Sequence, residues 1–206
     1  MDVGFIGGVV PGNAADLAPL VEAGVLAFKC FLIDSGVKEF PHVDEMQLRE
    51  SMPILASLGR VLMAHAELPA PIARAVAELD PSADPRCHAT WLSTRPPEAE
   101  EQAITVLIAL ARETNARVHV VHVAAAGAIP ILRRARAEGL SLSAETCPHY
   151  LVFTAESIPD GATRFKCAPP IREKAHREAL WAALNSGDLD MIASDHSPCP
   201  PSLKLP

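Results

Sequence analysis

The sequence predicts an α/β fold with a parallel sheet. Short segments rich in Val, Ile and Leu alternate with segments of helical apolar spacing, which is the pattern of repeated β-α-β units. The chain shows no internal repeat and no low-complexity linker. Its 206 residues are enough for one domain with a substantial core. We therefore expect a single α/β domain.

Six segments have the length and composition of buried strands. They cover residues 3–10, 25–29, 60–65, 117–122, 140–145 and 190–195. Almost every interval between them contains a helix signal, so we expect parallel strands joined by helical crossovers.

Four helices are predicted in these intervals. The helix at 44–58 contains Pro53, which lacks a backbone donor and should bend or split it. The clearest helix, at 96–111, begins with two prolines and then has apolar residues three and four positions apart. The helices at 129–138 and 174–186 are each followed by a glycine that can cap the C-terminus.

Composition argues against several classes of function. The net charge is −7, whereas nucleic-acid-binding surfaces are usually basic. No segment reaches the roughly 18–20 apolar residues of a membrane span. The five cysteines form no C-x-x-C pair, and the first residues lack the pattern of a secretory signal. We expect a cytoplasmic protein that binds neither nucleic acid nor membrane.

Four polar side chains are predicted at the last inward-facing position of a strand, where a parallel barrel places its active-site groups. They are Lys29, His65, His122 and Asp195, the last within the segment SDHSPCPP at 194–201. Imidazole nitrogens and carboxylate oxygens are zinc ligands, and zinc makes a bound water acidic enough to ionise near neutral pH. The set predicts metal-assisted hydrolysis.

Two residues of this region need separate interpretation. His119 has the opposite parity to His122, so we predict that it faces the helices and is structural. Lys29 cannot bind a metal as an ammonium ion, because that form has no lone pair. Burial among apolar neighbours would lower its pKa and free the amine; otherwise the amine must be modified.

Six motifs resemble those of the cyclic amidohydrolases, a family that includes dihydroorotases, hydantoinases and allantoinases. They are FKCF at 28–31, AHAE at 64–67, VHV at 121–123, ETCPHYL at 145–151, KCAPPIR at 166–172 and SDHS at 194–197. The resemblance covers essentially the whole chain. The amino-acid sequences of residues 7–13, 28–31 and 194–201 are most similar to those of allantoinases.

The resemblance implies a (β/α)8 barrel with two zinc ions. A carbamate formed from Lys29 and carbon dioxide would bridge the metals, and His65 and His122 would complete one site. Asp195 would bind the other metal and shuttle a proton. The implied reaction is attack of a metal-bridging hydroxide on a ring carbonyl of a cyclic ureide, which for allantoinases is (S)-allantoin, giving allantoate.

The resemblance also implies three substrate-binding residues. Ala168 lies in a Cys-Ala-Pro-Pro segment that resembles a loop whose backbone groups bind the ring amide, although the prolines equally suit a stiff turn before a helix. Asp34 and Ser35 lie where hydantoinase-like proteins place a substrate-facing loop; solvated loop residues are the alternative. Cys147 and His149 receive no assigned role.

The chain departs from the family pattern near both ends. The family's His-x-His pair, which holds a metal on the first barrel strand, has no counterpart in the sequence. By comparison with the family, the six strands correspond to barrel strands three to eight. Residues 1–206 are therefore expected to form a single incomplete barrel domain, a fragment lacking the N-terminal strands and part of a C-terminal β-sandwich. We expect little activity from this chain alone.

Other interpretations stay open. Dihydroorotase and hydantoinase or dihydropyrimidinase activities need the same ligands and differ in the substrate pocket. A non-catalytic homologue or remnant with a scaffold role is a different class, although such proteins usually lose metal ligands. Manganese, cobalt or iron also suit the donor set. The family suggests a homo-oligomer, a tetramer, for the complete protein.

Overall fold

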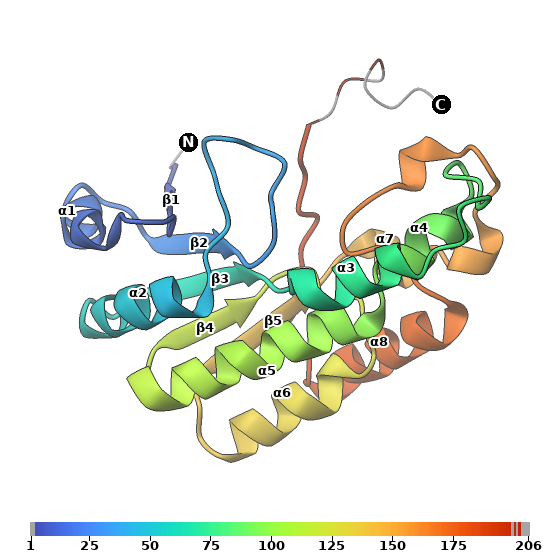
Figure 1. The fold of residues 1–206 in the computed structure, drawn as a ribbon. Coiled ribbons are helices and arrows are strands. Elements are labelled where there is room, and N and C mark those ends of the chain that lie inside the picture. Colours follow the sequence, from blue (N-terminus) through green and yellow to red (C-terminus); the bar gives the residue numbers. More distant parts are fainter. Residues whose placement is uncertain (1–2, 199, 201, 203–206) are drawn as a thin grey trace.

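A parallel sheet forms the centre of the molecule in a computed structural model that describes residues 3–198, 200 and 202 (Figure 1). Its six strands are arranged in the order in which they occur in the sequence. They are β1 (Ile6–Gly8), β2 (Ala27–Phe31), β3 (Val61–His65), β4 (Arg117–Val120), β5 (Leu142–Thr146) and β6 (Met191–Ile192). The predicted α/β class with parallel strands is confirmed.

Helices connect the strands and pack along one side of the sheet (Figure 1). The α-helices are α1 (Leu17–Glu22), α2 (Glu45–Ser57), α3 (Pro69–Ala77), α4 (His88–Thr94), α5 (Pro97–Thr114), α6 (Ala128–Ala137), α7 (Pro148–Val152) and α8 (Lys174–Ser186). Short 3-10 turns are η1 (Ala14–Asp16), η2 (Ala155–Ser157) and η3 (Thr163–Phe165). Helix α5 contacts both α2 and α6, so the three form a continuous layer.

Local sequence explains where the predicted helices begin and end. Asp44 caps α2, because its side chain accepts a hydrogen bond from the Gln47 amide while the Gln47 side chain accepts from the Asp44 amide. Helix α2 stays continuous through Pro53, which lies on its exposed side, so the predicted break is absent. Helix α8 ends at Gly187, whose φ of 77° is the left-handed conformation that glycine adopts without a steric cost.

The apolar core lies between the sheet and the helix layer. Phe28, Leu62 and Val118 pair in register on neighbouring strands and are buried. Leu48 of α2 and Leu107 of α5 are fully buried against this cluster. Each such side chain contributes about 1.5–3 kcal/mol by its removal from water. The core fixes which side chains of each strand face the helices and which face the opposite side.

Strand register corrects the predicted orientation of one histidine. Lys29 pairs with Met63, and Met63 pairs with His119, so the three side chains lie on the face opposite the apolar core. The prediction that His119 faces the helices was wrong. It failed because β4 ends at Val120 and His122 has a φ of 43°, so strand alternation does not continue to His122.

Of the four residues predicted at the ends of strands, His65 alone is the last residue of its strand. Strand β2 continues past Lys29 to Phe31, whose register partner is His65, so Lys29 lies deeper in the sheet than His65. His122 follows β4 rather than closing it. Asp195 lies beyond the two-residue strand β6 and has a φ of 46°. The four residues therefore reach the same end of the sheet by different backbone routes.

Candidate active site

One cavity at the carboxyl end of the strands brings the four predicted residues together. Lys29, His65, His122 and Asp195 all line it, and its volume is about 730 Å³. A second cavity of about 690 Å³ lies beside it and shares His122, Ala168, Asp195 and Ser197 in its lining. Parallel α/β proteins place their active sites at this end of the sheet. The location agrees with the expectation from sequence.

His65 is held by ring contacts and by a carboxylate. It closes β3, and its ring stacks on Phe31 with the ring centroids 5.2 Å apart. The ring centroid of His122 lies 4.6 Å away in an edge-on arrangement. The Nε2 atom of His65 lies 2.7 Å from Oε2 of Glu67. Two imidazoles thus stand side by side in one wall of the cavity.

Glu67 is a fully buried carboxylate behind His65. Its Oε2 atom also accepts a hydrogen bond of 2.6 Å from the Arg95 guanidinium. Burial by itself raises the pKa of the Glu67 carboxyl, but the interactions of this carboxyl with His65 and Arg95 outweigh the effect of burial. The pKa therefore lies below its usual value. Glu67 is an ionised hydrogen-bond acceptor at neutral pH.

His122 is a buried imidazole on a left-handed backbone. Burial lowers the pKa of His122 well below its usual value, and the neighbouring His65 and Lys29 lower it further because they carry or can carry positive charge. His122 is therefore neutral near pH 7 and has a lone pair on one ring nitrogen. A neutral imidazole is the form that binds transition metals.

Lys29 is half-buried on the same face of the sheet. Burial lowers the pKa of the Lys29 amine, and the negative charges of Asp195 and Glu145 oppose this effect without cancelling it. The Nζ atom lies 5.2 Å from the centroid of the Phe31 ring. A lowered pKa increases the fraction of free amine, which is the nucleophilic form.

Asp195 has the least structural support of the four residues. Its strand, β6, pairs with β5 alone among the described strands. After β6, the Ala193 amide donates a backbone hydrogen bond of 3.0 Å to the Thr146 carbonyl. Asp195 itself is exposed. Of the SDHSPCPP segment, Cys199 and Pro201 lie outside the described residues.

These donors fit a metal ion in part. His65 and His122 are adjacent, and His122 is neutral. Within residues 3–198, 200 and 202, however, no three His, Cys, Asp or Glu side chains lie close enough together to hold a metal. Asp195 therefore does not join the two imidazoles in a three-ligand cluster. Of the other residues predicted as ligands, Lys29 could supply a third donor beside them, but it must lose its charge to serve.

The loop that contains Ala168 is fixed on both sides. The Trp91 indole donates to the Cys167 carbonyl at 2.9 Å, and the Tyr150 hydroxyl donates to the Pro169 carbonyl at 2.7 Å. The Ala168–Pro169 peptide is cis. Ala168 lines both cavities, and the hydrogen bonds to its two neighbours hold its backbone where a substrate could contact it.

Asp34 and Ser35 also line the cavity that contains Lys29. The Ser35 hydroxyl donates to the Phe40 carbonyl at 2.6 Å and accepts from the Val37 amide at 3.1 Å. Asp34 accepts a hydrogen bond from the Gly36 amide. Ser35 therefore has a clear role in shaping its own loop, while Asp34 is exposed at the rim.

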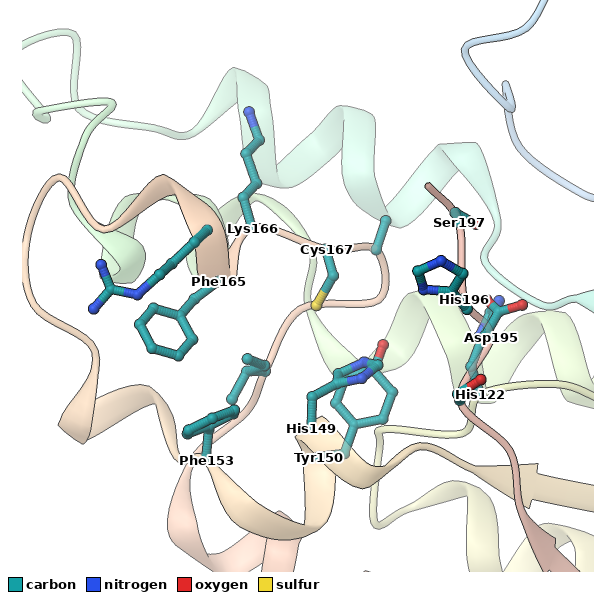
Figure 2. Close-up of a pocket in the computed structure, with 14 residues that line it drawn as sticks. His122, His149, Tyr150, Phe153, Phe165, Lys166, Cys167, Asp195, His196 and Ser197 are labelled. Atoms are coloured by element: carbon teal, nitrogen blue, oxygen red, sulfur yellow. The ribbon is translucent and has the colours of Figure 1, made fainter. Parts of the chain in front are cut away.

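The ETCPHYL motif supports the segment that follows His122 and the loop that contains Ala168. Thr146 donates from its hydroxyl to the Val123 carbonyl at 2.8 Å, next to His122. The rings of His149 and Tyr150 are in contact, with centroids 4.1 Å apart, and stand at the base of the second cavity (Figure 2). Tyr150 has a structural role through Pro169, whereas His149 lines the cavity.

Sequence reasoning assigned no role to two residues of this region. Glu67 belongs to the AHAE motif, and its spacing of two from His65 was the available signal, because such residues share a face. Arg95 also lines the cavity with Lys29. It follows α4 and lies 28 residues beyond Glu67 in the chain, so the linear sequence gave no signal for their contact.

None of the helices among residues 3–198, 200 and 202 has the length and apolar character needed to cross a membrane.

No family model matches the chain, but curated proteins do. It is 48% identical to an allantoinase of Streptomyces avermitilis over 204 residues, covering 99% of this chain and 45% of that protein. It is 48% identical to an allantoinase of Saccharomyces cerevisiae over 206 residues, covering 98% of this chain and 44% of that protein. The chain thus spans less than half the length of the curated relatives it matches.

Solved structures give the same picture of the fold. The L-hydantoinase (dihydropyrimidinase) of Arthrobacter aurescens superimposes with a TM-score of 0.87 at 28% identity, over 95% of this chain and 43% of that one. A dihydropyrimidinase of Brevibacillus agri superimposes with a TM-score of 0.84 at 33% identity, over 97% of this chain and 44% of that one. The predicted part of a (β/α)8 barrel and the resemblance to cyclic amidohydrolases, allantoinases above all, are confirmed.

Proposed function

We propose that the protein is a zinc-dependent cyclic amidohydrolase and that its reaction is the hydrolysis of (S)-allantoin to allantoate. One observation carries the proposal. The chain is 48% identical to a curated allantoinase, and Lys29, His65, His122 and Asp195 line a single cavity at the carboxyl end of its strands.

Zinc binding is assigned to these four residues. His65 and His122 would hold one zinc ion through ring nitrogens, and Asp195 would hold a second through its carboxylate. Lys29 would bind as a carbamate, formed by attack of its free amine on carbon dioxide with loss of a proton. When bound, zinc supplies Lewis acidity, which lowers the pKa of a coordinated water and polarises a carbonyl. The lowered pKa of Lys29 supports the carbamate, because carbon dioxide reacts with the free amine.

Asp195 has the role of proton shuttle. Its carboxylate accepts the proton that the attacking water loses, and then gives it to the ring nitrogen when the cyclic C–N bond breaks. The exposure of Asp195 and its position between the two cavities are compatible with contact to a substrate that occupies both. Ala168 contributes backbone groups to the ring amide, and Asp34 and Ser35 form the opposite rim.

A chimeric enzyme tests the proposal directly. This chain replaces the matching 204-residue segment of the Streptomyces avermitilis allantoinase, and initial rates are compared with allantoin, a 5-substituted hydantoin and dihydroorotate. We expect allantoin to be the best substrate. Asp195→Asn should lower kcat by roughly 100-fold or more, as expected for loss of an acid-base group, and His65→Ala should remove bound zinc. Asp16→Asn, at an exposed aspartate that lines neither cavity, is the matched control.

Each alternative gives a different result in this experiment. Preference for the hydantoin would favour a hydantoinase, which the similarity to solved hydantoinases makes the main competing function. A folded chimera that binds zinc and hydrolyses none of the three compounds would favour a non-catalytic homologue. The same assay on this chain alone, supplied with zinc and bicarbonate, tests the expectation that it has little activity by itself.

Compartment and assembly belong to the proposal as well. We place the protein in the cytoplasm, because Cys30, Cys87 and Cys147 are free thiols. One relative carries the name "Allantoinase, mitochondrial", so fractionation is the relevant measurement. We also propose that the complete protein forms a homo-oligomer, which sedimentation of the purified protein would test.

A further inference from the structure

Two histidines on the inner side of the sheet are hydrogen-bonded to buried carboxylates. The Nε2 atom of His65 lies 2.7 Å from Glu67, and the Nε2 atom of His119 lies 3.1 Å from Glu145. The other ring nitrogen of His119 is also used, because Nδ1 lies 2.7 Å from the Ser143 hydroxyl. His119 thus has both nitrogens bound within the sheet, whereas His65 lines the cavity.

The contact with Glu67 determines which nitrogen of His65 is available. The Oε2 atom of Glu67 is also paired with the Arg95 guanidinium, so the group that faces His65 is a carboxylate, which can only accept a hydrogen bond. The proton of this contact therefore lies on Nε2 of His65. A neutral imidazole with its proton on Nε2 has its lone pair on Nδ1. The hydrogen bond made by one nitrogen in this way determines which nitrogen can bind a metal.

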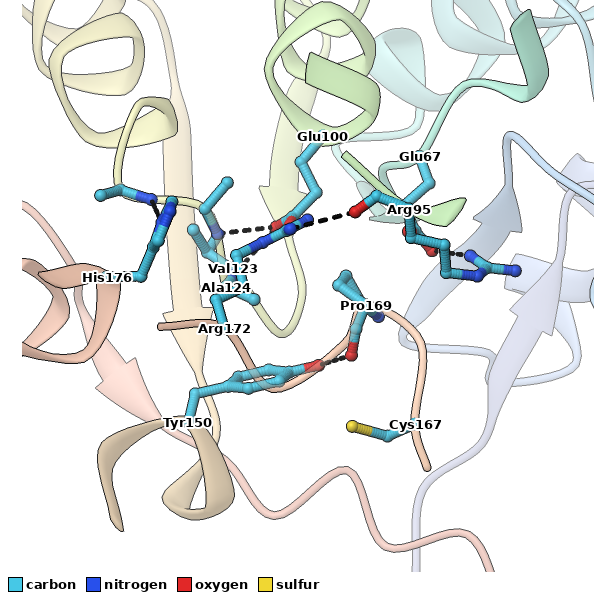
Figure 3. Close-up of polar contacts among 12 residues, drawn as sticks. Glu67, Arg95, Glu100, Val123, Ala124, Tyr150, Cys167, Pro169, Arg172 and His176 are labelled. Atoms are coloured by element: carbon cyan, nitrogen blue, oxygen red, sulfur yellow. Dashed lines mark hydrogen bonds and ion pairs between the residues drawn. The ribbon is translucent and has the colours of Figure 1, made fainter. Parts of the chain in front are cut away.

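Arg95 keeps Glu67 in place. Its guanidinium donates to the same Oε2 atom at 2.6 Å and lies over the Trp91 ring, 4.8 Å from the centroid. The Arg95 carbonyl accepts a hydrogen bond of 3.0 Å from the buried Arg172 (Figure 3). The carboxylate therefore has little freedom to rotate away from His65.

We propose that Glu67, fixed by Arg95, is a positioning residue that holds the Nε2–H tautomer of His65 and thereby presents Nδ1 as the metal-binding atom. This inference deepens the proposed function, because it concerns the same metal site. Glu67 acts through His65 and does not itself contact the substrate.

The tautomer can be read in the unmodified chain without any metal. Nitrogen-15 spectra of the histidine rings at about pH 8 separate protonated from bare ring nitrogens, and the signals that disappear in His65→Asn belong to His65. We expect Nε2 to be protonated and Nδ1 to be bare. A proton on Nδ1 would overturn the proposal. This measurement needs no substitution at Glu67, so it decides the matter even if variants there fail to fold.

Two substitutions then test the link to metal binding by titration with Co(II), followed by its visible absorption. Glu67→Leu removes the acceptor, and we expect a Co(II) affinity roughly 10- to 100-fold weaker, the usual effect of losing such a partner. Glu67→Gln keeps an oxygen that can accept from Nε2–H, and we expect it to restore most of the affinity.

Glu145→Leu is the matched control, because it removes the equivalent carboxylate from His119, which lies outside the proposed ligand set. We expect it to leave the tautomer of His65 unchanged. Equal Co(II) affinity in Glu67→Leu and the unmodified chain would overturn the proposal. Absence of any Co(II) binding by the unmodified chain would instead contradict the proposed metal site, while the metal-free tautomer measurement still tests Glu67.

Discussion

The two sides of the candidate site differ in how firmly the chain holds them. On one side, His65 and His122 are buried, their ring centroids are 4.6 Å apart, and Glu67 and Arg95 support His65 from behind. On the other side, Asp195 is exposed and follows a strand of two residues that pairs with β5 alone among the described strands.

This difference follows from position in the sheet. Strands β3 and β4 each have a partner on both sides and lie against the layer of α2, α5 and α6. Both strand neighbours and helices therefore restrain the residues at their ends. Met191 and Ile192 of β6 are 48% and 47% exposed, so few contacts restrain Asp195. Preorganised ligands need such support from packed neighbours, and only the imidazole side has it within the described residues.

The largest effect is expected from the buried ion pair that supports the imidazole side. Arg172 donates to Glu100 at 2.5 Å, and Glu100 accepts hydrogen bonds from the Ala124 and Ala125 amides in the segment after His122 (Figure 3). Burial raises the pKa of Glu100, so the carboxylate depends on this partner. Arg172→Met should lower the free energy of unfolding by about 3–5 kcal/mol, because it leaves an unpaired buried charge.

Denaturation with urea measures that loss, and a double variant controls for packing. Arg172→Met with Glu100→Gln removes both charges and keeps an oxygen acceptor for the two amides. It should recover a large part of the stability. If Arg172→Met alone cost less than about 1 kcal/mol, the ion pair would not be what holds this side together.

A smaller effect is expected from apolar side chains on the two sides. Leu107 of α5 is fully buried, whereas Ile192 of β6 is 47% exposed. Leu107→Ala should cost about 3 kcal/mol of unfolding free energy through lost burial and a cavity. Ile192→Ala should cost less than about 1 kcal/mol, because its side chain is already largely in water. If chemical denaturation showed the same loss of unfolding free energy in Leu107→Ala and Ile192→Ala, the contrast between the two sides would be contradicted.

The smallest effect concerns the ion pair next to β6. Asp188 accepts hydrogen bonds from Arg133 of α6, which lower its pKa to about 2 from 3.8. Since the folded value lies below the unfolded one, the stabilisation is complete above about pH 4 and is lost as the pH falls towards about 2. Arg133 is 63% exposed, so solvent screening should make this the smallest of the contributions.

Asp188→Asn isolates this contribution. We expect it to be slightly less stable than the unmodified chain at pH 7 and to show a smaller fall in stability between pH 4 and pH 2. Asp16→Asn is a suitable control, because Asp16 is an exposed aspartate of η1, whereas Asp188 accepts hydrogen bonds from Arg133. An identical acid transition in the unmodified chain and Asp188→Asn would show that the pair contributes nothing.

Much of the fold could be predicted because it depends on local signals. Each predicted strand has an observed counterpart, and α8 occupies the predicted residues 174–186. Apolar periodicity, a proline start and a glycine cap act within a few residues, so they can be read from the linear chain. Pro53 gave a misleading signal, since its exposed position in α2 lets the helix continue.

The orientation of side chains near strand ends could not be predicted in the same way. Alternation placed Lys29 and His65 on the correct face but gave the wrong face for His119. The left-handed φ values of His122 and Asp195 end the alternation, and such backbone conformations for residues other than glycine depend on surrounding contacts.

The sequence alone determined the α/β class, the order of the helices and strands, and the four candidate ligands. Composition, residue spacing and motif sequence are all properties of short segments. Only the tertiary structure decided that Glu67 and Arg95 stand behind His65, that His119 is bound within the sheet, and that Asp195 is exposed. These features depend on register, on backbone turns after the strands and on contacts between residues far apart in the chain, which no local pattern encodes.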